Sequence, residues 1–469
     1  MTLPTPDIAG AKAALSHLDM DTNPVSVRAK SRDFFWYSPV LKARLDHVTA
    51  DFVVSPRTEA EVIEVLRVCY AHNVPVTTRG TGTGNYGQAM PLAGGCVLHM
   101  HQMNAVKSIH PGRVIVEPGC LLKDLDAACI ANSGQELRMF SSTWATATIG
   151  GFIAGGSGGV GSVRWGALRD PGNIIRLRVV TMEAEPRVLE FSGDDLARVS
   201  HAYGSNGIIV ELEMPLAPAY DWVGLFVTFP DFATANAYAY DLAHLDGVLI
   251  KLATVFEAPI AQDYFQRVAP YVTPGQAVVA LMVAPHAMSA FQTFTASHAG
   301  TAVIYRSDQS TWAKEPGHVF EYGWNHTTLR ALKVDPTITY LQVGYGTDNP
   351  LALCEQARAA FGPEVMQHIE VMRSGGKITL ASLSLVRFTT EARLDAIVAQ
   401  HEAMGAHVYN PHRYTLEEGG RQAVDARQLD FKREADPKGL LNPGKMIAWD
   451  DPTFGFDKIY HYAGLQAAE

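Results

Sequence analysis

The segment from Pro75 to Met100, PVTTRGTGTGNYGQAMPLAGGCVLHM, most constrains what this chain can fold into. A short apolar stretch leads into closely spaced glycines, and a second apolar stretch, residues 96–100, leads out of them. Because Gly80, Gly82 and Gly84 lack a Cβ atom, successive amides can turn to the same side and form a concave row of N–H donors. The pattern therefore predicts a strand, an anion-binding glycine loop and a second strand.

The same loop has the spacing of a dinucleotide-binding turn at residues 82–87, GTGNYG. Such a turn requires a helix that starts inside the pattern and an acidic residue about 20 positions later. Here Pro91, Gly94 and Gly95 follow, and the first acidic residue downstream is Glu117. We therefore exclude a Rossmann turn at this position.

A second concentration of glycines lies at residues 148–161, TIGGFIAGGSGGVG, with seven glycines from position 150 onward. This density costs too much conformational entropy for an ordinary helix or strand, so we expect the backbone to approach a large ligand closely. The neighbouring motifs are EPG at 117–119, SST at 141–143, RWG at 164–166 with Asp170, and the strand-like GIIVELE at 207–213.

These motifs, in this order over residues 50–218, resemble the FAD-binding domain of the vanillyl-alcohol oxidase superfamily. The closing segment DPKGLLNPGK, residues 436–445, is similar to the end of the glycolate oxidase D-subunit and D-lactate dehydrogenase branch. The resemblance implies an α+β protein with a PCMH-type FAD-binding domain over residues 1–218. It also implies a cap domain of antiparallel sheet and flanking helices over 219–436, and a segment, 437–469, that returns to the first domain.

The resemblance implies FAD as the cofactor, with its pyrophosphate against the amides of residues 80–84 and 148–151. The residues expected to contact FAD are Arg79, Gly80, Thr81, Gly82, Thr83, Gly84, Pro118, Gly119, Ser142, Thr148, Ile149, Gly150, Gly151, Gly158, Gly166, Ile209 and Asn442. In relatives with covalent FAD, the linking histidine and cysteine fall at Thr83 and near Ala145. FAD is therefore expected to be non-covalent here, and a link from the cap stays open.

Oxidation by a flavin also requires a base near the ring and a group that binds the substrate. The segment 407–418, HVYNPHRYTLEE, contains the candidates. Aligning residues 405–406 with the glycine pair that precedes the Glu-His-Gly motif of related 2-hydroxyacid dehydrogenases sets His412 on the family's proposed base, although Pro411 and Arg413 depart from that motif. His412 is expected either to act as this base or to cap a turn.

Two neighbours of His412 are further catalytic candidates. Arg413 is expected to clamp a substrate carboxylate bidentately, or else to pair with Glu417 or Glu418. Tyr409 is expected to donate a hydrogen bond to the substrate, or else to pack as a buried ring.

The cap region carries an aromatic cluster, FEYGWNH at residues 320–326, and Tyr345 between two glycines. Aromatic density suits a flat, apolar substrate, so Tyr322, His326 and Tyr345 are the expected substrate contacts. The alternative is that Tyr322 and Trp324 belong to the core.

No metal site is expected. The only His-x-His pattern, His99-Met100-His101, supplies two ligands, which make an incomplete site. The cap region between residues 219 and 400 has no such cluster.

Composition excludes several classes of protein. The 469 residues, 47% hydrophobic and 18% charged, are typical of a globular enzyme of two or three domains. A net charge of -10 argues against nucleic acid or an anionic membrane surface as a partner. Five cysteines without a C-x-x-C pair predict a reducing, cytoplasmic environment. The longest apolar run, 277–285, is too short to span a membrane, and we expect no integral membrane segment.

The functional prediction is an FAD-dependent oxidoreductase that oxidises an alcohol or 2-hydroxy acid by hydride transfer to the flavin, with proton removal by a base such as His412. Two alternatives stay open: oxidation of an aromatic or phenolic alcohol, and a non-catalytic flavin-binding subunit of a larger complex. The expected partners are a small-molecule substrate and an electron acceptor, which is oxygen, a quinone, a cytochrome or an electron-transfer flavoprotein. A homo-oligomer is left open.

Overall fold

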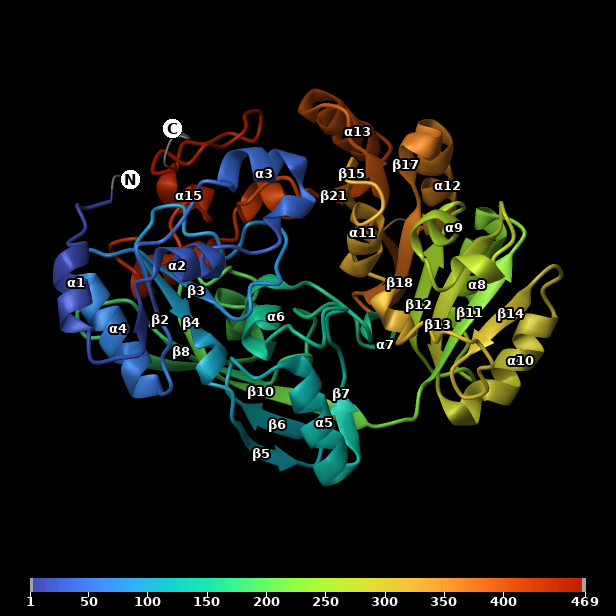
Figure 1. Ribbon diagram of the computed structural model, residues 1–469, viewed down its shortest axis with the longest axis horizontal. Coiled ribbons are helices and arrows are strands. Elements are labelled where there is room, and N and C mark those ends of the chain that lie inside the picture. Colours follow the sequence, from blue (N-terminus) through green and yellow to red (C-terminus); the bar gives the residue numbers. More distant parts are fainter. Residues whose placement is uncertain (1–2, 347, 466–469) are drawn as a thin grey trace.

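The computed structural model describes residues 3–346 and 348–465. An N-terminal region, blue to green in Figure 1, lies beside a cap region, yellow to orange. The N-terminal region begins with α1 (Ile8–Ala14), α2 (Pro24–Lys30), η1 (Phe35–Tyr37) and α3 (Pro39–Leu45). Its first sheet, ordered β1-β2-β4-β3, contains β1 (Met20–Asp21), β2 (Phe52–Val54), β3 (Val76–Arg79) and β4 (Cys96–His99).

Helix α4 (Glu59–Ala71) connects β2 to β3. The Thr58 hydroxyl accepts a hydrogen bond from the Glu61 amide at 3.2 Å, and the Glu61 carboxylate accepts one from the Arg57 amide at 2.8 Å. The Thr58 half of a capping box is therefore formed, whereas the Glu61 carboxylate binds the amide of Arg57, one residue before the N-cap. Val62 and Val65 lie on the buried face of the helix, against the first sheet.

Strands β3 and β4 are parallel neighbours, yet no helix connects them. Parallel strands need a connection of a dozen or more residues, and here residues 80–95 provide it as an irregular loop. The prediction of a strand, a glycine loop and a strand is confirmed. An irregular loop, rather than a helix, therefore follows the C-terminal end of β3.

The second sheet of the N-terminal region is antiparallel, ordered β5-β6-β10-β8-β9, with β7 paired to β10. Its strands are β5 (Val106–His110), β6 (Arg113–Val116), β7 (Gln135–Leu137), β8 (Arg176–Val180), β9 (Val188–Ser192) and β10 (Ile208–Pro218). The accompanying helices are η2 (Met100–Gln102), α5 (Leu122–Ser133), α6 (Ile149–Gly155), α7 (Ser162–Trp165) and η3 (Gly193–Arg198).

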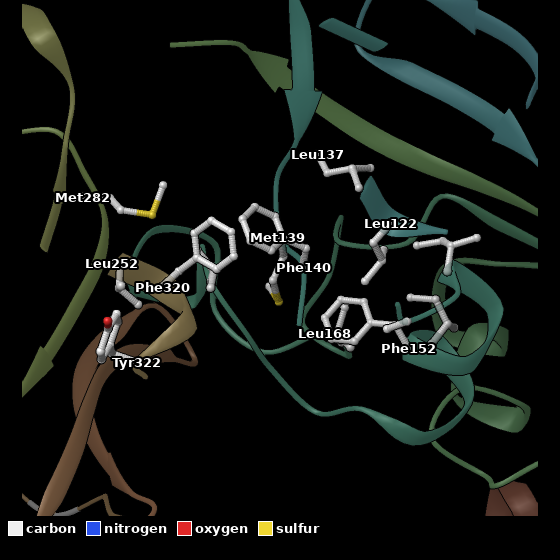
Figure 2. Packing of buried hydrophobic residues seen from close by; sticks show 14 of the residues in the cluster. Leu122, Leu137, Met139, Phe140, Phe152, Leu168, Leu252, Met282, Phe320 and Tyr322 are labelled. Atoms are coloured by element: carbon white, nitrogen blue, oxygen red, sulfur yellow. The ribbon is translucent and has the colours of Figure 1, made fainter. Parts of the chain in front are cut away.

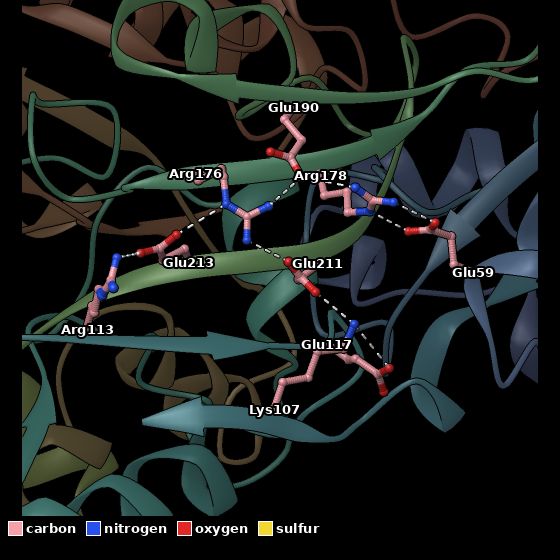
Figure 3. A network of polar contacts seen from close by, with 9 residues as sticks. All are labelled: Glu59, Lys107, Arg113, Glu117, Arg176, Arg178, Glu190, Glu211 and Glu213. Atoms are coloured by element: carbon pink, nitrogen blue, oxygen red, sulfur yellow. Dashed lines mark hydrogen bonds and ion pairs between the residues drawn. The ribbon is translucent and has the colours of Figure 1, made fainter. Parts of the chain in front are cut away.

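A network of ion pairs crosses one face of this sheet (Figure 3). Arg176 of β8 contacts Glu190 of β9 at 3.1 Å and Glu211 of β10 at 2.6 Å. The next basic residue on β8, Arg178, binds both carboxylate oxygens of Glu59 at 2.7 and 3.0 Å. Because Glu59 belongs to α4, this bidentate pair attaches the second sheet to the helix that covers the first.

Two local sequence patterns differ from the structure. The proline pair Pro215 and Pro218 is typical of a linker, but both residues belong to β10, and residues 219–222 make the connection to the cap. The apolar pattern from Leu380 to Phe388 predicts one strand, but the structure divides it between β19 (Lys377–Ser382) and β20 (Leu385–Arg387), which belong to different sheets.

The cap region is built on an eight-stranded antiparallel sheet, ordered β14-β11-β13-β12-β18-β19-β16-β21. Its strands are β11 (Val223–Phe229), β12 (Ile250–Phe256), β13 (Ala277–Val283), β14 (Ala302–Arg306), β16 (Gln342–Tyr345), β18 (His368–Ser374), β19 (Lys377–Ser382) and β21 (His407–Tyr409). A smaller sheet combines β15 (Ile338–Tyr340), β20 (Leu385–Arg387) and β17 (Val365–Met366).

The two faces of the cap sheet are buried against different partners. One face packs against α8 (Phe232–Ala243), α10 (Met288–Ala296), α12 (Pro350–Phe361) and α13 (Glu391–Ala403). The other packs against α9 (Ile260–Tyr264), α11 (Asn325–Leu332) and η6 (Val319–Glu321), and it continues into the core of the N-terminal region. The strands of the sheet are therefore apolar on both faces, as in β13 with the sequence AVVALMV.

The hydrophobic core is continuous across the junction between the two regions (Figure 2). Phe140 of the N-terminal region lies 5.2 Å, between ring centroids, from Phe320 of the cap. The buried Lys251 ammonium of β12 pairs with Glu136 of β7 at 2.8 Å. These contacts hold the cap against the first region.

The C-terminal segment returns to the N-terminal region. Helix α14 (Ala426–Ala435) packs against η3, and α15 (Ile447–Asp450) follows. Between them, the Val76 amide donates to the Leu440 carbonyl, and the Asn442 amide donates to the Val76 carbonyl, each at 2.8 Å. None of the described helices has the length and apolar composition needed to cross a membrane.

Candidate functional site

A cavity of about 370 Å³ lies between the glycine loop and the cap. Its walls come from both glycine-rich segments, from residues 199–209, from the cap and from the segment that follows β21. The cap contributes Trp324, Asn325, Gln342 and Tyr409. Residues that are far apart in the sequence therefore meet at one cavity.

The glycine loop presents a row of unpaired amides to this cavity. Residues 81–85 all line it, and in the described part of the chain no protein acceptor contacts their backbone N–H groups. Residues 81–84 are partly exposed and Asn85 is buried, so these amides can reach a bound ligand, and five consecutive donors without a protein acceptor suit a ligand that accepts hydrogen bonds. Successive amides of this kind form an anion-binding concavity, which suits a pyrophosphate.

Arg79 maintains the shape of this loop from behind. Its guanidinium donates to the carbonyls of Thr81 at 2.6 Å, Arg32 at 3.0 Å and Gly80 at 3.2 Å. Burial lowers the pKa of Arg79, and the nearby Asp33 carboxylate opposes this effect. Arg79 lines the cavity, but its guanidinium N–H groups are used by backbone carbonyls and hold the loop in shape.

The second glycine segment has a different role from the one expected. The amides of Ile149, Gly150 and Gly151 donate to Cys120 O, Pro118 O and Thr148 Oγ1 at 2.9, 2.9 and 3.3 Å. These amides are already paired and are not free to bind a pyrophosphate. The segment instead provides a wall with few side chains, since Gly150, Gly151, Gly155, Gly156 and Gly158 line the cavity.

Most of the expected cofactor residues line the cavity. They are Arg79, Gly80, Thr81, Gly82, Thr83, Gly84, Pro118, Thr148, Gly150, Gly151, Gly158 and Ile209. Ser142 lines a smaller neighbouring pocket, whereas Gly119, Ile149, Gly166 and Asn442 line neither space. The Asn442 side chain supports the wall from outside, because its amide donates to Gln88 O at 2.8 Å and Tyr203 O at 2.6 Å.

His412, the expected base, lies outside the cavity lining and is 1% exposed. Its Nε2 contacts the Tyr340 carbonyl at 2.8 Å, and its Nδ1 contacts Ser38 Oγ at 2.7 Å. A carbonyl only accepts, so Nε2 carries the proton and Nδ1 accepts from the Ser38 hydroxyl. Burial lowers the pKa of His412 to about 3, although the Tyr340 carbonyl opposes the shift. The ring is a neutral bridge between the two regions, with its lone pair already used.

Arg413 also differs from expectation. Its guanidinium pairs with Asp395 at 2.9 Å and Glu391 at 3.3 Å, both on α13, and it lines neither cavity. The alternative partners, Glu417 and Glu418, instead accept backbone amides of the C-terminal segment. Arg413 therefore attaches the segment after β21 to the cap.

Tyr409 is the one expected catalytic residue that lines the cavity, and it is 44% exposed. The expected substrate residues lie elsewhere. The Tyr322 hydroxyl donates to Pro316 O at 3.0 Å, and the Tyr345 hydroxyl donates to Gln367 at 3.3 Å, so both rings belong to the core. His326 lies on α11 outside both spaces, and burial lowers its pKa to about 4.

Sequence reasoning missed several residues of the site. Phe34, Tyr37 and Asn85 line the smaller pocket, and Gln342 lines the cavity. Asn85 lies inside the glycine loop, and this position in the sequence could have identified it as a site residue. The aromatic run at 34–37 had no pattern to connect it with a loop some 50 residues later.

Residues 50–190 match the family model described as FAD binding domain. Over 168 residues the chain is 31% identical to an uncharacterized FAD-linked oxidoreductase of Mycobacterium tuberculosis, and this match covers 35% of each protein. The glycolate oxidase subunit GlcD of Bacillus subtilis is 31% identical over 177 residues, 36% of this chain and 37% of that subunit. The chain thus matches about a third of the length of these relatives.

Two further similarities extend over most of the chain. The D-lactate dehydrogenase of Archaeoglobus fulgidus is 24% identical over 84% of this chain and 91% of that enzyme. The structure of an alkyldihydroxyacetonephosphate synthase superposes with a TM-score of 0.69 at 15% identity, covering 94% of this chain and 87% of that one. At 15% identity, the similarity to the synthase shows a shared fold.

The close contacts of the loop agree with an FAD site. A Cβ atom on Gly80 would lie 2.0 Å from Thr148 Oγ1, and one on Gly82 would lie 2.1 Å from Arg79 Nη2, so side chains are excluded where the unpaired amides line the cavity. Residues 50–190 of this chain are an FAD-binding domain, of the PCMH type expected from the sequence, and FAD is its cofactor.

Proposed function

We propose that this protein is an FAD-dependent oxidoreductase that oxidises a hydroxyl-bearing carbon of a small molecule at the cap end of the cavity. The observation that carries the proposal is the row of unpaired amides at residues 81–85, in a cavity that continues to Trp324, Gln342 and Tyr409. When FAD is bound, it supplies the hydride acceptor. The amides would hold its pyrophosphate, and the cap side chains would position the substrate.

The proton of the substrate hydroxyl needs an acceptor within hydrogen-bond reach. His412 is unsuited to this role, because its lone pair is used by Ser38. His201 and Tyr409 both line the cavity. We therefore assign proton transfer and substrate orientation to side chains that line the cavity.

The charges around the cavity favour an uncharged substrate. Among the side chains that the structure describes, the arginine and lysine residues of the lining are Arg79 and Arg169. Arg79 is used by backbone carbonyls, and Arg169 donates to Asp425 and Ala197 O, both at 3.1 Å. A buried carboxylate without a free cation is costly. The lack of a free cation in the described lining favours an aromatic or phenolic alcohol over a 2-hydroxy acid such as glycolate or lactate.

The test is the visible spectrum of the purified protein under anaerobic conditions. Glycolate, D-lactate, L-lactate, benzyl alcohol and 4-hydroxybenzyl alcohol are added one at a time. Bleaching of the flavin band by an alcohol supports the proposal. A chain that binds FAD but is reduced by none of these compounds would instead favour a non-catalytic flavin-binding subunit, and a chain without a flavin band would refute the cofactor assignment.

A further inference from the structure

The second half of the glycine loop is held by a buried carboxylate from the N-terminal segment. The Phe34 amide donates to Gly84 O at 2.6 Å, and the Ala89 amide donates to Asp33 Oδ2 at 3.1 Å. The other oxygen, Asp33 Oδ1, accepts from the Phe35 amide at 2.9 Å. Asp33 is 3% exposed and belongs to the cavity lining. Its carboxylate therefore fixes the loop on the side away from β3.

A buried lysine from the C-terminal segment holds the same part of the loop. The Lys445 side chain is 0% exposed, and its ammonium donates to Gly87 O at 2.6 Å. Arg79 supports the start of the loop through the carbonyls of Gly80 and Thr81. The charges of Lys445 and Arg79 both act on the Asp33 carboxylate. One carboxylate and two cations, from three distant segments, are therefore buried around a single loop.

The charges of this cluster, Asp33, Arg79 and Lys445, do not balance. When all three groups are ionised, two cations face one carboxylate, and buried charge without a partner is costly. The amides of residues 81–85 belong to the same loop, and they line a cavity that suits a pyrophosphate, which is anionic. A bound pyrophosphate would therefore favour the most positive state of the cluster.

Two members of the cluster change charge near neutral pH. Burial raises the pKa of Asp33 to about 6, although the Ala89 amide and the charge of Lys445 oppose the shift. Burial lowers the pKa of Lys445 to about 7, and the Asp33 carboxylate opposes this effect. The charge of the cluster therefore becomes more positive as the pH falls.

We propose that Asp33 and Lys445 are positioning residues of the glycine loop that couple FAD binding to proton uptake. A nearby negative charge favours the protonated form of a carboxyl group and of an amine alike. Bound FAD would therefore raise the proton affinity of both groups, and by linkage protons raise the affinity for FAD. This affinity is highest at low pH and falls as the pH rises through the two pKa values. The inference concerns the cofactor and is independent of the substrate.

The groups that face the pair from other elements keep their charge state over this range. They include Arg79 of β3, Tyr340 of β15 and Tyr414, whose ring centre lies 5.2 Å from the Lys445 ammonium. Burial raises the pKa of both tyrosines, so both stay neutral. An arginine stays charged in proteins. Within this group of side chains, the pH dependence therefore comes from Asp33 and Lys445.

The experiment measures the Kd of FAD by equilibrium dialysis of the full-length, FAD-loaded protein, with free FAD quantified by its fluorescence. Samples are compared at about pH 6, 7 and 8, where uptake of one full proton would change Kd about tenfold per pH unit. The wild-type Kd is expected to rise about fivefold to twentyfold from the lowest to the highest pH, which corresponds to partial uptake.

Two variants separate proton uptake from a purely structural role. The double variant Asp33→Asn with Lys445→Met lacks both titrating groups, so its Kd is expected to rise less than about twofold over the same range. Asp33→Asn alone is expected to move the rise to lower pH, because Lys445 loses the carboxylate that favours its charged form. A structural role alone would change Kd by the same factor at every pH.

Asp126→Asn is the matched control. Asp126 is also a buried carboxylate whose pKa is raised by burial, and it accepts the Leu137 amide at 2.8 Å. It does not line the cavity, so this variant is expected to keep the wild-type dependence of Kd on pH.

Two results would overturn the inference. One is a wild-type Kd that is the same at every pH. The other is an unchanged rise in the double variant, because another group of the cavity lining, such as His201, would then take up the proton. If the double variant fails to fold, Asp33→Asn decides the test: a rise at lower pH supports the inference, and the wild-type profile overturns it. The measurement uses no substrate, so either result leaves the proposed reaction to its own test.

Discussion

Replacing Gly82 by alanine is expected to weaken FAD binding strongly. Gly82 has φ +74°, where a non-glycine residue costs about 1–2 kcal/mol. Its new Cβ would lie 2.1 Å from Arg79 Nη2 and 2.9 Å from Arg32 O. Relieving this overlap moves the Arg79 guanidinium off the Thr81 carbonyl, a charge-assisted hydrogen bond worth about 1.5–3 kcal/mol.

The substitution weakens FAD binding more than it destabilises the FAD-free loop. Without FAD, the loop can relieve the overlap by turning its amides away from one another. Binding requires them to return, so about 3–4 kcal/mol of the strain opposes the cofactor, which raises Kd by about 10²–10³-fold. The assay is the flavin-to-protein ratio after purification, followed by fluorescence titration of the FAD-free protein with FAD.

The matched control is Gly112→Ala. Gly112 has φ +79°, but a Cβ there meets nothing within 4 Å, and the residue lies in the turn between β5 and β6. This variant carries the same backbone penalty without the overlap and is expected to keep FAD. Full FAD content and wild-type affinity in Gly82→Ala would refute the assignment of the loop.

Two further predictions concern stability. Burial lowers the pKa of His412 to about 3, below an unfolded value near 6.5, so the unfolded state binds the extra proton and stability falls as the pH drops below about 6.5. The unfolding free energies of the wild type and of His412→Gln are measured in urea at a series of pH values between about 4 and 7. On acidification the wild type should lose up to about 1.4 kcal/mol more unfolding free energy per pH unit than the variant. Parallel curves of unfolding free energy against pH would contradict this. Breaking the buried pair by Lys251→Met should cost about 3–5 kcal/mol of unfolding free energy, and Glu136→Leu in the same chain should restore part of it. A single-variant loss below about 1 kcal/mol would show that the pair contributes little at the junction.

Local patterns predicted much of the fold. Thr58 is a typical N-cap residue at the start of α4, and the apolar spacing of Leu122, Leu125 and Cys129 is typical of a helix such as α5 (Leu122–Ser133). These signals act within one or two turns of the chain. The strand break between β19 and β20 was missed, because the alternation of apolar residues continues across Leu383 and Ser384 while the partner strands change.

The candidate site was predicted in part. The first glycine loop lines the cavity as expected, whereas the amides at 149–151 are paired within the protein. Sequence letters do not reveal which amides find a partner, since Cys120 O and Pro118 O come from another segment. The aromatic cluster of the cap was identified, but only its Trp324 and Asn325 reach the cavity, because Tyr322 faces the core.

The sequence by itself determined the cradle for FAD, because the absence of Cβ atoms at Gly80, Gly82 and Gly84 is a local property that no distant contact changes. The tertiary structure alone decided the chemistry of His412. Its ring is neutralised by burial and held by Ser38 and Tyr340, which lie 374 and 72 positions away in the chain. A residue's pKa and its free lone pairs depend on such neighbours, so the acid–base groups of this site follow from packing rather than from sequence pattern.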